Sequence, residues 1–211
     1  IIKTFITADT AETNKSYNDA TVFSFWGIYE IETLERKTGI YGLHWLDCYE
    51  MRIEPKDLKD AFLDFWQDCM RHEIPPLLAA IEKKSTGVTL LSVIKDELRG
   101  IQVRDIERNR SSGSKTQRFL EMQPFIAEKR ISFTRGAKHV DMCIKHMSKI
   151  TANEAHRFDD IADTLTDAIK IALIDKTLIH TTINKTDYNQ IANTLTQKSN
   201  KVERLKGLAY K

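Results

Sequence analysis

LLAAIE, at residues 77–82, gives the main evidence for the fold class. It consists of five consecutive apolar residues followed directly by Glu82. Before it, apolar residues at helical spacing over 58–69 predict an amphipathic helix. A short apolar run after a helix is typical of a strand buried on both faces, and such strands lie inside parallel or mixed sheets. We therefore predict an interior strand at 77–81 with Glu82 at its carboxyl end.

Three more strands are predicted before that helix. KTFITA at 3–8, TVFSFWGI at 21–28 and the segment 39–51 are rich in β-branched and aromatic residues. Turn-like segments separate them along the chain. Consecutive strands with this spacing predict an antiparallel meander.

Helices and short strands alternate after residue 87. Helical patterns lie at 88–98, 114–122, 140–150 and 153–175, and strand patterns lie at 101–106 and 131–133. Ser114 and Gln117 have the spacing of a capping box, which starts a helix. This order of elements predicts an α/β fold, with a mixed β-sheet flanked by helices.

Composition divides the chain at residue 175. Residues 1–175 hold the predicted elements and form one domain, whereas 176–211 is a Thr-, Asn- and Lys-rich stretch of net charge +5 that we expect to be an appended tail. The segment 99–138 carries a net charge of +6, although the whole chain carries only +2. Basic charge beside an acidic site suits a polyanionic ligand.

Some classes of protein are disfavoured by the sequence. No apolar run approaches the roughly 20 residues that span a bilayer, and no secretory leader precedes the first strand, so we expect no membrane partner. Cys48, Cys69 and Cys143 are an odd number at wide spacings. They form no disulfide framework, which favours a reducing cytosol.

Carboxylates recur where the predicted elements begin or end. Asp9 and Glu82 end strands, and Asp159, Asp160 and Asp163 lie in the first turns of the last helix. Strand ends of such a sheet gather at one edge, and acids three or four apart share a helix face. Clustered carboxylates need a compensating cation, and Mg²⁺ or Mn²⁺ prefers oxygen ligands. Each acid alone is explained as well by a turn or by the helix dipole, so the hypothesis rests on their joint placement.

The other candidate residues are a lysine, three arginines and a histidine. Lys115 and Arg118 share a helix face, and Arg108 and Arg110 flank the preceding loop, so all four are candidates for binding DNA phosphates. Solvated surface charges are the alternative. His156 lies one turn before the acids and could orient an attacking water or support a ligand from behind; an exposed polar residue is the simpler reading.

The acidic segments resemble a known family. KTFITADTA at 3–11, LLAAIEKKSTG at 77–87 and HRFDDIADTLTDAI at 156–169 resemble the three acidic motifs of the nuclease domain of viral terminase large subunits. These subunits are the DNA-packaging motors of tailed phages and herpesviruses. SGSKTQR at 112–118 is similar to the family's basic segment. The resemblance covers about 1–175 and is greatest to headful-packaging, short-tailed bacteriophages of enteric bacteria.

The resemblance implies an RNase H-like fold and a metal-dependent endonuclease. It implies that two Mg²⁺ or Mn²⁺ ions assist in-line hydrolysis of double-stranded viral DNA when genome packaging starts and ends, in the host cytoplasm. By motif, Asp9 is the first acid and Glu82 the second. For the third acid we rank Asp160 first, Asp159 second and Asp163 third.

The resemblance also implies partners. They are double-stranded DNA, the small terminase subunit, an N-terminal ATPase domain of the same protein, and the portal protein of the procapsid, reached through 176–211. The ATPase half is missing here, because nothing matches a GxxxxGK[ST] phosphate-binding loop. Two other functions stay open: a junction resolvase or transposase of the same fold, and a non-catalytic DNA- or portal-binding module.

Overall fold

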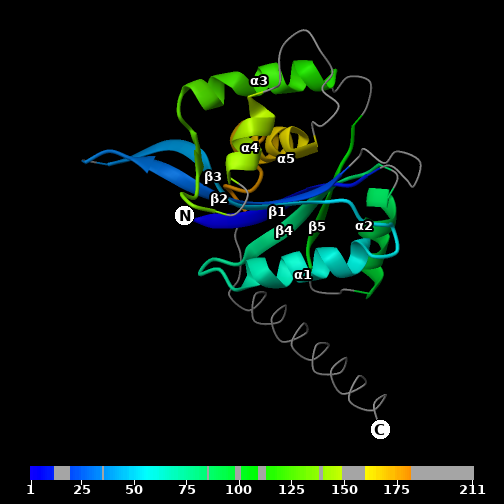
Figure 1. Cartoon of the computed structure of the whole chain (residues 1–211). Coiled ribbons are helices and arrows are strands. Elements are labelled where there is room, and N and C mark those ends of the chain that lie inside the picture. The colour runs from blue at the N-terminus through cyan, green and yellow to red at the C-terminus, as the bar shows by residue number, and fades with distance from the viewer. Residues whose placement is uncertain are drawn as a thin grey trace.

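The fold is three-layered, with a six-stranded sheet between two groups of helices (Figure 1). The computed structural model describes residues 1–11, 20–34, 36–84, 86–97, 101–108, 113–137, 140–148 and 160–181, apart from the side chains of Glu97, Lys115 and Val140. Helices α1 and α2 cover one face of the sheet, and α3, α4 and α5 cover the other (Figure 1). This is the α/β architecture that the order of elements predicts.

The sheet is mixed. Its strands, in chain order, are β1 (Lys3–Asp9), β2 (Thr21–Glu32), β3 (Lys37–Met51), β4 (Pro76–Glu82), β5 (Val103–Ile106) and β6 (Ile131–Phe133). In space the order is β5-β4-β1-β2-β3-β6. Strands β1, β2 and β3 form the predicted antiparallel meander, while β4, β5 and β6 each pair in parallel with a neighbour. The predicted interior strand is β4, which lies between β5 and β1.

The helices agree with the predicted order and differ at their ends. They are α1 (Leu58–Met70), α2 (Thr86–Glu97), α3 (Lys115–Ala127), α4 (Val140–Met147) and α5 (Asp160–Ile169), followed by the π-helical turn η2 (Lys170–Ile174). Ser114 caps α3 by accepting a hydrogen bond from the Gln117 amide at 3.1 Å. Helix α3 continues through Pro124 and ends at Ala127, five residues beyond its predicted end at residue 122. Residues 153–159 of the predicted last helix lie outside the described residues.

Two apolar cores lie on opposite faces of the sheet. One packs the aromatic and aliphatic face of α1 and α2 against the sheet, and it includes Phe23, Phe62 and Trp66. The other packs α5 and η2 against Trp26 and Trp45. All three cysteines are buried and free. Within the described ranges, no helix is long and apolar enough to cross a membrane.

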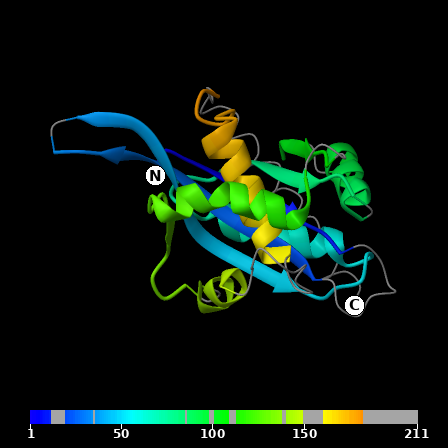
Figure 2. The ribbon, with the colours of Figure 1, turned by 90° about the horizontal axis from the view of Figure 1, so that it is seen from above.

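Buried polar contacts fix where α5 lies on the sheet. The Thr7 hydroxyl of β1 donates to the Thr164 carbonyl at 3.0 Å, and the Trp26 indole N–H donates to the Thr7 hydroxyl at 2.8 Å. The Ser24 and Thr164 hydroxyls share a 2.8 Å hydrogen bond. Because buried polar groups are costly unless paired, this set holds α5 in one position across β1 and β2, as Figure 2 shows from above.

Lys3 ties the start of β1 to the chain that follows η2. Its ammonium group donates to the carbonyls of Leu178, Ile179 and Thr181 at 2.8, 2.7 and 2.6 Å. Leu178 is only 2% exposed and belongs to the core on the α5 side. The residues up to Thr181 are therefore packed onto the fold, while 182–211 lie outside the described residues and the division at residue 175 stays a prediction.

Replacing Lys3 with methionine keeps most of the stem but removes the donors to three carbonyls. We expect Lys3→Met to lower the free energy of unfolding by about 1–2 kcal/mol, since hydrogen bonds to charged groups contribute about this much when partly solvated. Urea denaturation measures this change. Lys83→Met is the matched control, because Lys83 pairs with Glu107 on the surface, where an ion pair contributes little to stability. Equal losses in the two variants would contradict the role of Lys3.

Candidate active site

Two buried acids end neighbouring parallel strands. Asp9 is the last residue of β1 and is 8% exposed, and Glu82 is the last residue of β4 and is 5% exposed. Strands β1 and β4 pair in parallel with Ala8 opposite Ile81, so the next residue of each strand emerges at the same edge of the sheet. The structure therefore places these two predicted acids side by side along that edge.

Helix α5 adds acids from above the same edge. Asp160 is its first residue, and a carboxylate oxygen accepts a hydrogen bond from the Ala20 amide at 3.2 Å, immediately before β2. Asp163 and Asp167, one and two turns further on, are 5% and 4% exposed. The predicted residues Asp159 and His156 lie outside the described part of the chain.

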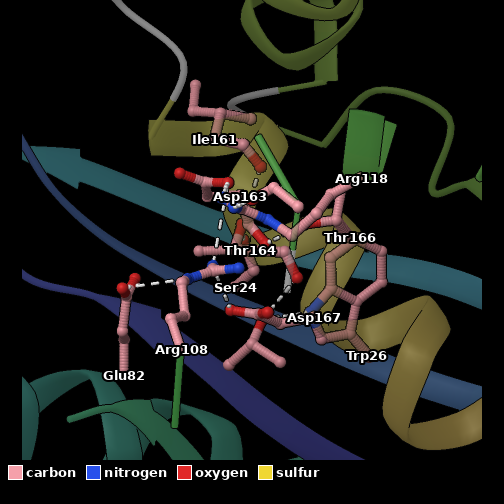
Figure 3. A network of polar contacts seen from close by, with 12 residues as sticks. Ser24, Trp26, Glu82, Arg108, Arg118, Ile161, Asp163, Thr164, Thr166 and Asp167 are labelled. Carbon is pink, nitrogen blue, oxygen red and sulfur yellow. Dashed lines mark hydrogen bonds and ion pairs between the residues drawn. The ribbon is translucent and has the colours of Figure 1, made fainter. Parts of the chain in front are cut away.

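The Arg108 guanidinium connects the sheet to α5 (Figure 3). Its Nε lies 2.9 Å from a Glu82 carboxylate oxygen. Its Nη2 donates to Asp167 at 3.0 Å and lies 3.7 Å from Asp163. The Arg108 side chain is 17% exposed. The three carboxylates therefore face one guanidinium that is largely removed from water.

Arg118 of α3 supplies a second guanidinium. Its Nη2 donates to Asp163 at 2.8 Å, and its Nη1 donates to the Gly113 carbonyl at 3.3 Å. Two of the three arginines that the sequence suggested for DNA binding, Arg108 and Arg118, thus point inward to carboxylates (Figure 3). Arg110 and the Lys115 side chain lie outside what the structure describes.

Comparison with known proteins bears on this arrangement. Residues 78–171 match the family described as the terminase RNase H-like domain. The match begins within β4 and ends within η2, so it includes Glu82, both arginines and the acids of α5.

The match over residues 78–171 supports a terminase nuclease domain.

The mixed sheet with helices on both faces agrees with this RNase H-like fold, and the family indicates a nuclease function in packaging. A search of curated proteins found none that matches the chain.

Burial sets the protonation behaviour of the acids and arginines at this edge. The pKa of Asp167 is raised to about 7, chiefly by burial; Asp163 and Glu82 add to the rise, while Arg108 and Arg118 oppose it. Burial alone would lower the pKa of Arg108, but the carboxylates of Asp167, Asp163 and Glu82 outweigh burial and raise it. Arg108 therefore stays charged, and Asp167 exchanges its proton near neutral pH.

Asp167 was missing from the candidate residues drawn from the sequence. A signal was present, because Asp160, Asp163 and Asp167 are spaced i, i+3 and i+7, which places them on one helical face. The pattern of the same helix is dominated by its apolar stripe, and Asp167 is not part of that stripe. Burial of Asp167 opposite Arg108 is a tertiary contact that spacing alone does not show.

The donor chemistry of this edge fits a hard divalent cation. Asp9, Glu82, Asp160 and Asp163 offer carboxylate oxygens, the ligands that Mg²⁺ and Mn²⁺ prefer. In the part of the chain that the structure describes, no three acidic, histidine or cysteine side chains form a ready-made metal cage. Glu82 and Asp163 instead face guanidinium groups. Holding a metal therefore requires these ion pairs to rearrange.

Gly87 supports Glu82 from the first turn of α2. A methyl group built on Gly87 would lie 2.1 Å from the Glu82 carbonyl oxygen and 3.1 Å from the Thr10 hydroxyl. The Gly87 amide donates to the Lys84 carbonyl, and the Lys84 amide donates to the Glu82 carbonyl. The tight turn after β4 therefore leaves no room for a side chain at this position.

Gly87→Ala is expected to displace the end of β4 and to destabilise the fold. Overpacking of this kind costs about 1–3 kcal/mol, measurable by urea denaturation. Val88→Ala on the same helix is the control, because Val88 is 47% exposed and surface changes usually stay within about 0.5 kcal/mol. A Gly87→Ala protein as stable as the control would show that the turn adapts.

The raised pKa of Asp167 makes stability depend on pH. The folded state retains this proton up to about pH 7, whereas the unfolded chain releases it near the ordinary value of 3.8. The contribution is fully present below 3.8 and is lost as the pH rises to about 7. The unfolding free energy of the wild type minus that of Asp167→Asn should therefore be smaller at about pH 8 than at about pH 4.5.

Denaturation with urea at those two pH values measures the difference. Asp64→Asn is the matched control, because Asp64 is an exposed residue of α1. A wild-type minus Asp167→Asn difference that is the same at both pH values would contradict a buried carboxyl with a raised pKa.

Proposed function

We propose that this domain is a metal-dependent endonuclease that cuts double-stranded viral DNA at the initiation and termination of genome packaging. One observation carries the proposal: Asp9 and Glu82 are buried at the ends of adjacent parallel strands, under the acids of α5, in a chain whose residues 78–171 match the terminase RNase H-like domain. Burial of several carboxylates at one edge is costly for stability, so a role in chemistry explains their placement better than stability does.

The proposed ligands are Asp9, Glu82, Asp160 and Asp163. A pair of Mg²⁺ or Mn²⁺ ions bound there would supply activation of a water molecule and stabilisation of the leaving oxygen. The chain's own groups position the ligands: the Ala20 amide orients Asp160, and the Thr7 and Ser24 contacts with Thr164 fix the helix that carries Asp163.

The phosphate of the DNA would enter beside positive charge. Arg108 and Arg118 are the guanidinium groups next to the acids in the described part of the chain, and Lys115 begins α3 beside Arg118. Guanidinium groups bind phosphate oxygens through two parallel N–H donors. They would hold the backbone at this edge without reading sequence.

The proposed setting is genome packaging in the host cytoplasm. The partners we propose are an N-terminal ATPase domain of the same protein, the small terminase subunit, and the portal protein through 176–211. The family match to a terminase domain supports this setting.

The competing function is a DNA- or portal-binding module without catalysis. The ion pairs of Glu82 and Asp163 with arginines favour it, since paired acids can be purely structural. A digestion assay separates the two functions, because only the nuclease cleaves plasmid DNA when Mn²⁺ is added.

Asp9→Asn and Asp163→Asn are expected to lower Mn²⁺-dependent plasmid cleavage by at least roughly a hundredfold, because each removes one of the proposed negatively charged ligands. The assay measures supercoiled plasmid converted to nicked and linear forms, and circular dichroism checks that each variant is folded. Asp64→Asn, on the exposed face of α1, should cleave like the wild type.

Full activity of folded Asp9→Asn would contradict the proposed chemistry. No cleavage by the wild type, together with intact DNA binding, would favour the non-catalytic module. Preference for a four-way junction over linear duplex would instead indicate a resolvase.

A further inference from the structure

Arg108 lies between the acid at the end of β4 and the acids of α5. Its guanidinium reaches from Glu82 on β4 to Asp163 and Asp167 on α5, at 2.9, 3.7 and 3.0 Å (Figure 3). The guanidinium group therefore links the carboxylate on the sheet to the carboxylates on the helix. A single cation thus bridges the acids that come from separate elements.

This position makes Arg108 a counter-charge for the acids. Glu82, Asp163 and Asp167 are each at most 5% exposed, and buried carboxylates without compensation are strongly unfavourable. In the described chain, Arg118 forms an ion pair with Asp163. Removal of Arg108 would leave Glu82 and Asp167 without their guanidinium partner.

The same contacts oppose a divalent ion. The oxygen of Glu82 that lies 2.9 Å from Arg108 cannot at the same time bind a metal at the usual 2.0–2.2 Å without bringing two cations within a few ångströms. Repulsion between such cations is strong where water is excluded. Metal and guanidinium therefore compete for the same carboxylates.

The geometry points to Arg108 as an internal counter-cation that competes with divalent metal for Glu82 and Asp163 and is displaced when metal binds. This inference rests on the proposed metal-dependent function. It gives the site two arrangements, an arginine-closed one and a metal-bound one. The closed arrangement keeps the acidic edge folded at low metal concentration and weakens metal affinity.

The test is calorimetric titration of Mn²⁺ into the wild-type chain and into Arg108→Gln at pH 8, without DNA. Removing a nearby positive charge in a poorly solvated site should lower the Kd for Mn²⁺ by about tenfold or more. The Arg108→Gln protein should also melt at a lower temperature without metal and regain more of its Tm with saturating Mn²⁺ than the wild type does.

Arg104→Gln is the matched control. Arg104 lies on β5, which ends two residues before Arg108, but it contacts Thr177 and lies 4.0 Å from Asp175, away from the acidic edge. Its loss removes the same unit of charge from the chain. We expect its Kd for Mn²⁺ to stay within about threefold of the wild type, since exposed charges are well screened.

The outcomes separate the two proposals. A wild-type chain that binds Mn²⁺ as tightly as Arg108→Gln does would overturn the role of Arg108 and leave the nuclease proposal standing. Absence of Mn²⁺ binding in both proteins would overturn both.

If Arg108→Gln does not fold, Arg108→Lys and the wild type provide the result. Lysine keeps the charge but cannot span acids on two elements, so its Kd should fall between those expected for wild type and glutamine. In the ¹⁵N-labelled wild type, the Arg108 Nε–H signal should shift as Mg²⁺ is added, because the Glu82 carboxylate 2.9 Å away would move to the metal. An unchanged signal at saturating Mg²⁺ would overturn the inference.

Discussion

The burial of negative charge at one edge of the sheet is the constraint on which the rest of this structure depends. Asp9 and Glu82 arrive there because β1 and β4 are parallel neighbours, and Asp163 and Asp167 arrive on α5. Uncompensated, such a set would protonate or unfold the domain. Arg108 and Arg118 provide the compensation. Their positions tie β5 and α3, which are otherwise peripheral elements, to the centre of the fold.

Helix α5 is held by two kinds of contact that serve different ends. Its apolar face, including Leu165 and Ile169, packs into the core with Trp26, which stabilises the fold. Its polar contacts through Thr164 with Thr7 and Ser24 are buried and directional, so they select one rotation and one axial position. A one-residue slip of the helix would break these bonds and carry the acids out of reach of Arg108.

Periodicity and apolar runs were sufficient to predict the strands, the helices and the acids at the strand ends. LLAAIE gave an interior strand ending in Glu82, and the spacing of Asp160 and Asp163 gave a shared helical face. Arg108 and Arg118 were predicted to bind DNA phosphates, but local sequence shows their charge and not the carboxylates that they contact. Their partners lie up to 59 residues away along the chain. Asp167 was missed for the same reason, since its burial follows from packing that no local pattern encodes.

The contact of Lys3 with the carbonyls after η2 determines where attached segments leave the domain. Lys3 and Asp9 are the two ends of β1, which at about 3.3 Å per residue places them roughly 20 Å apart. Residues 178–181 lie at the Lys3 end. Polypeptide joined before Lys3 or after Thr181 therefore starts at the edge opposite the acids. A label placed before Lys3 therefore starts about 20 Å from the acid at the other end of β1.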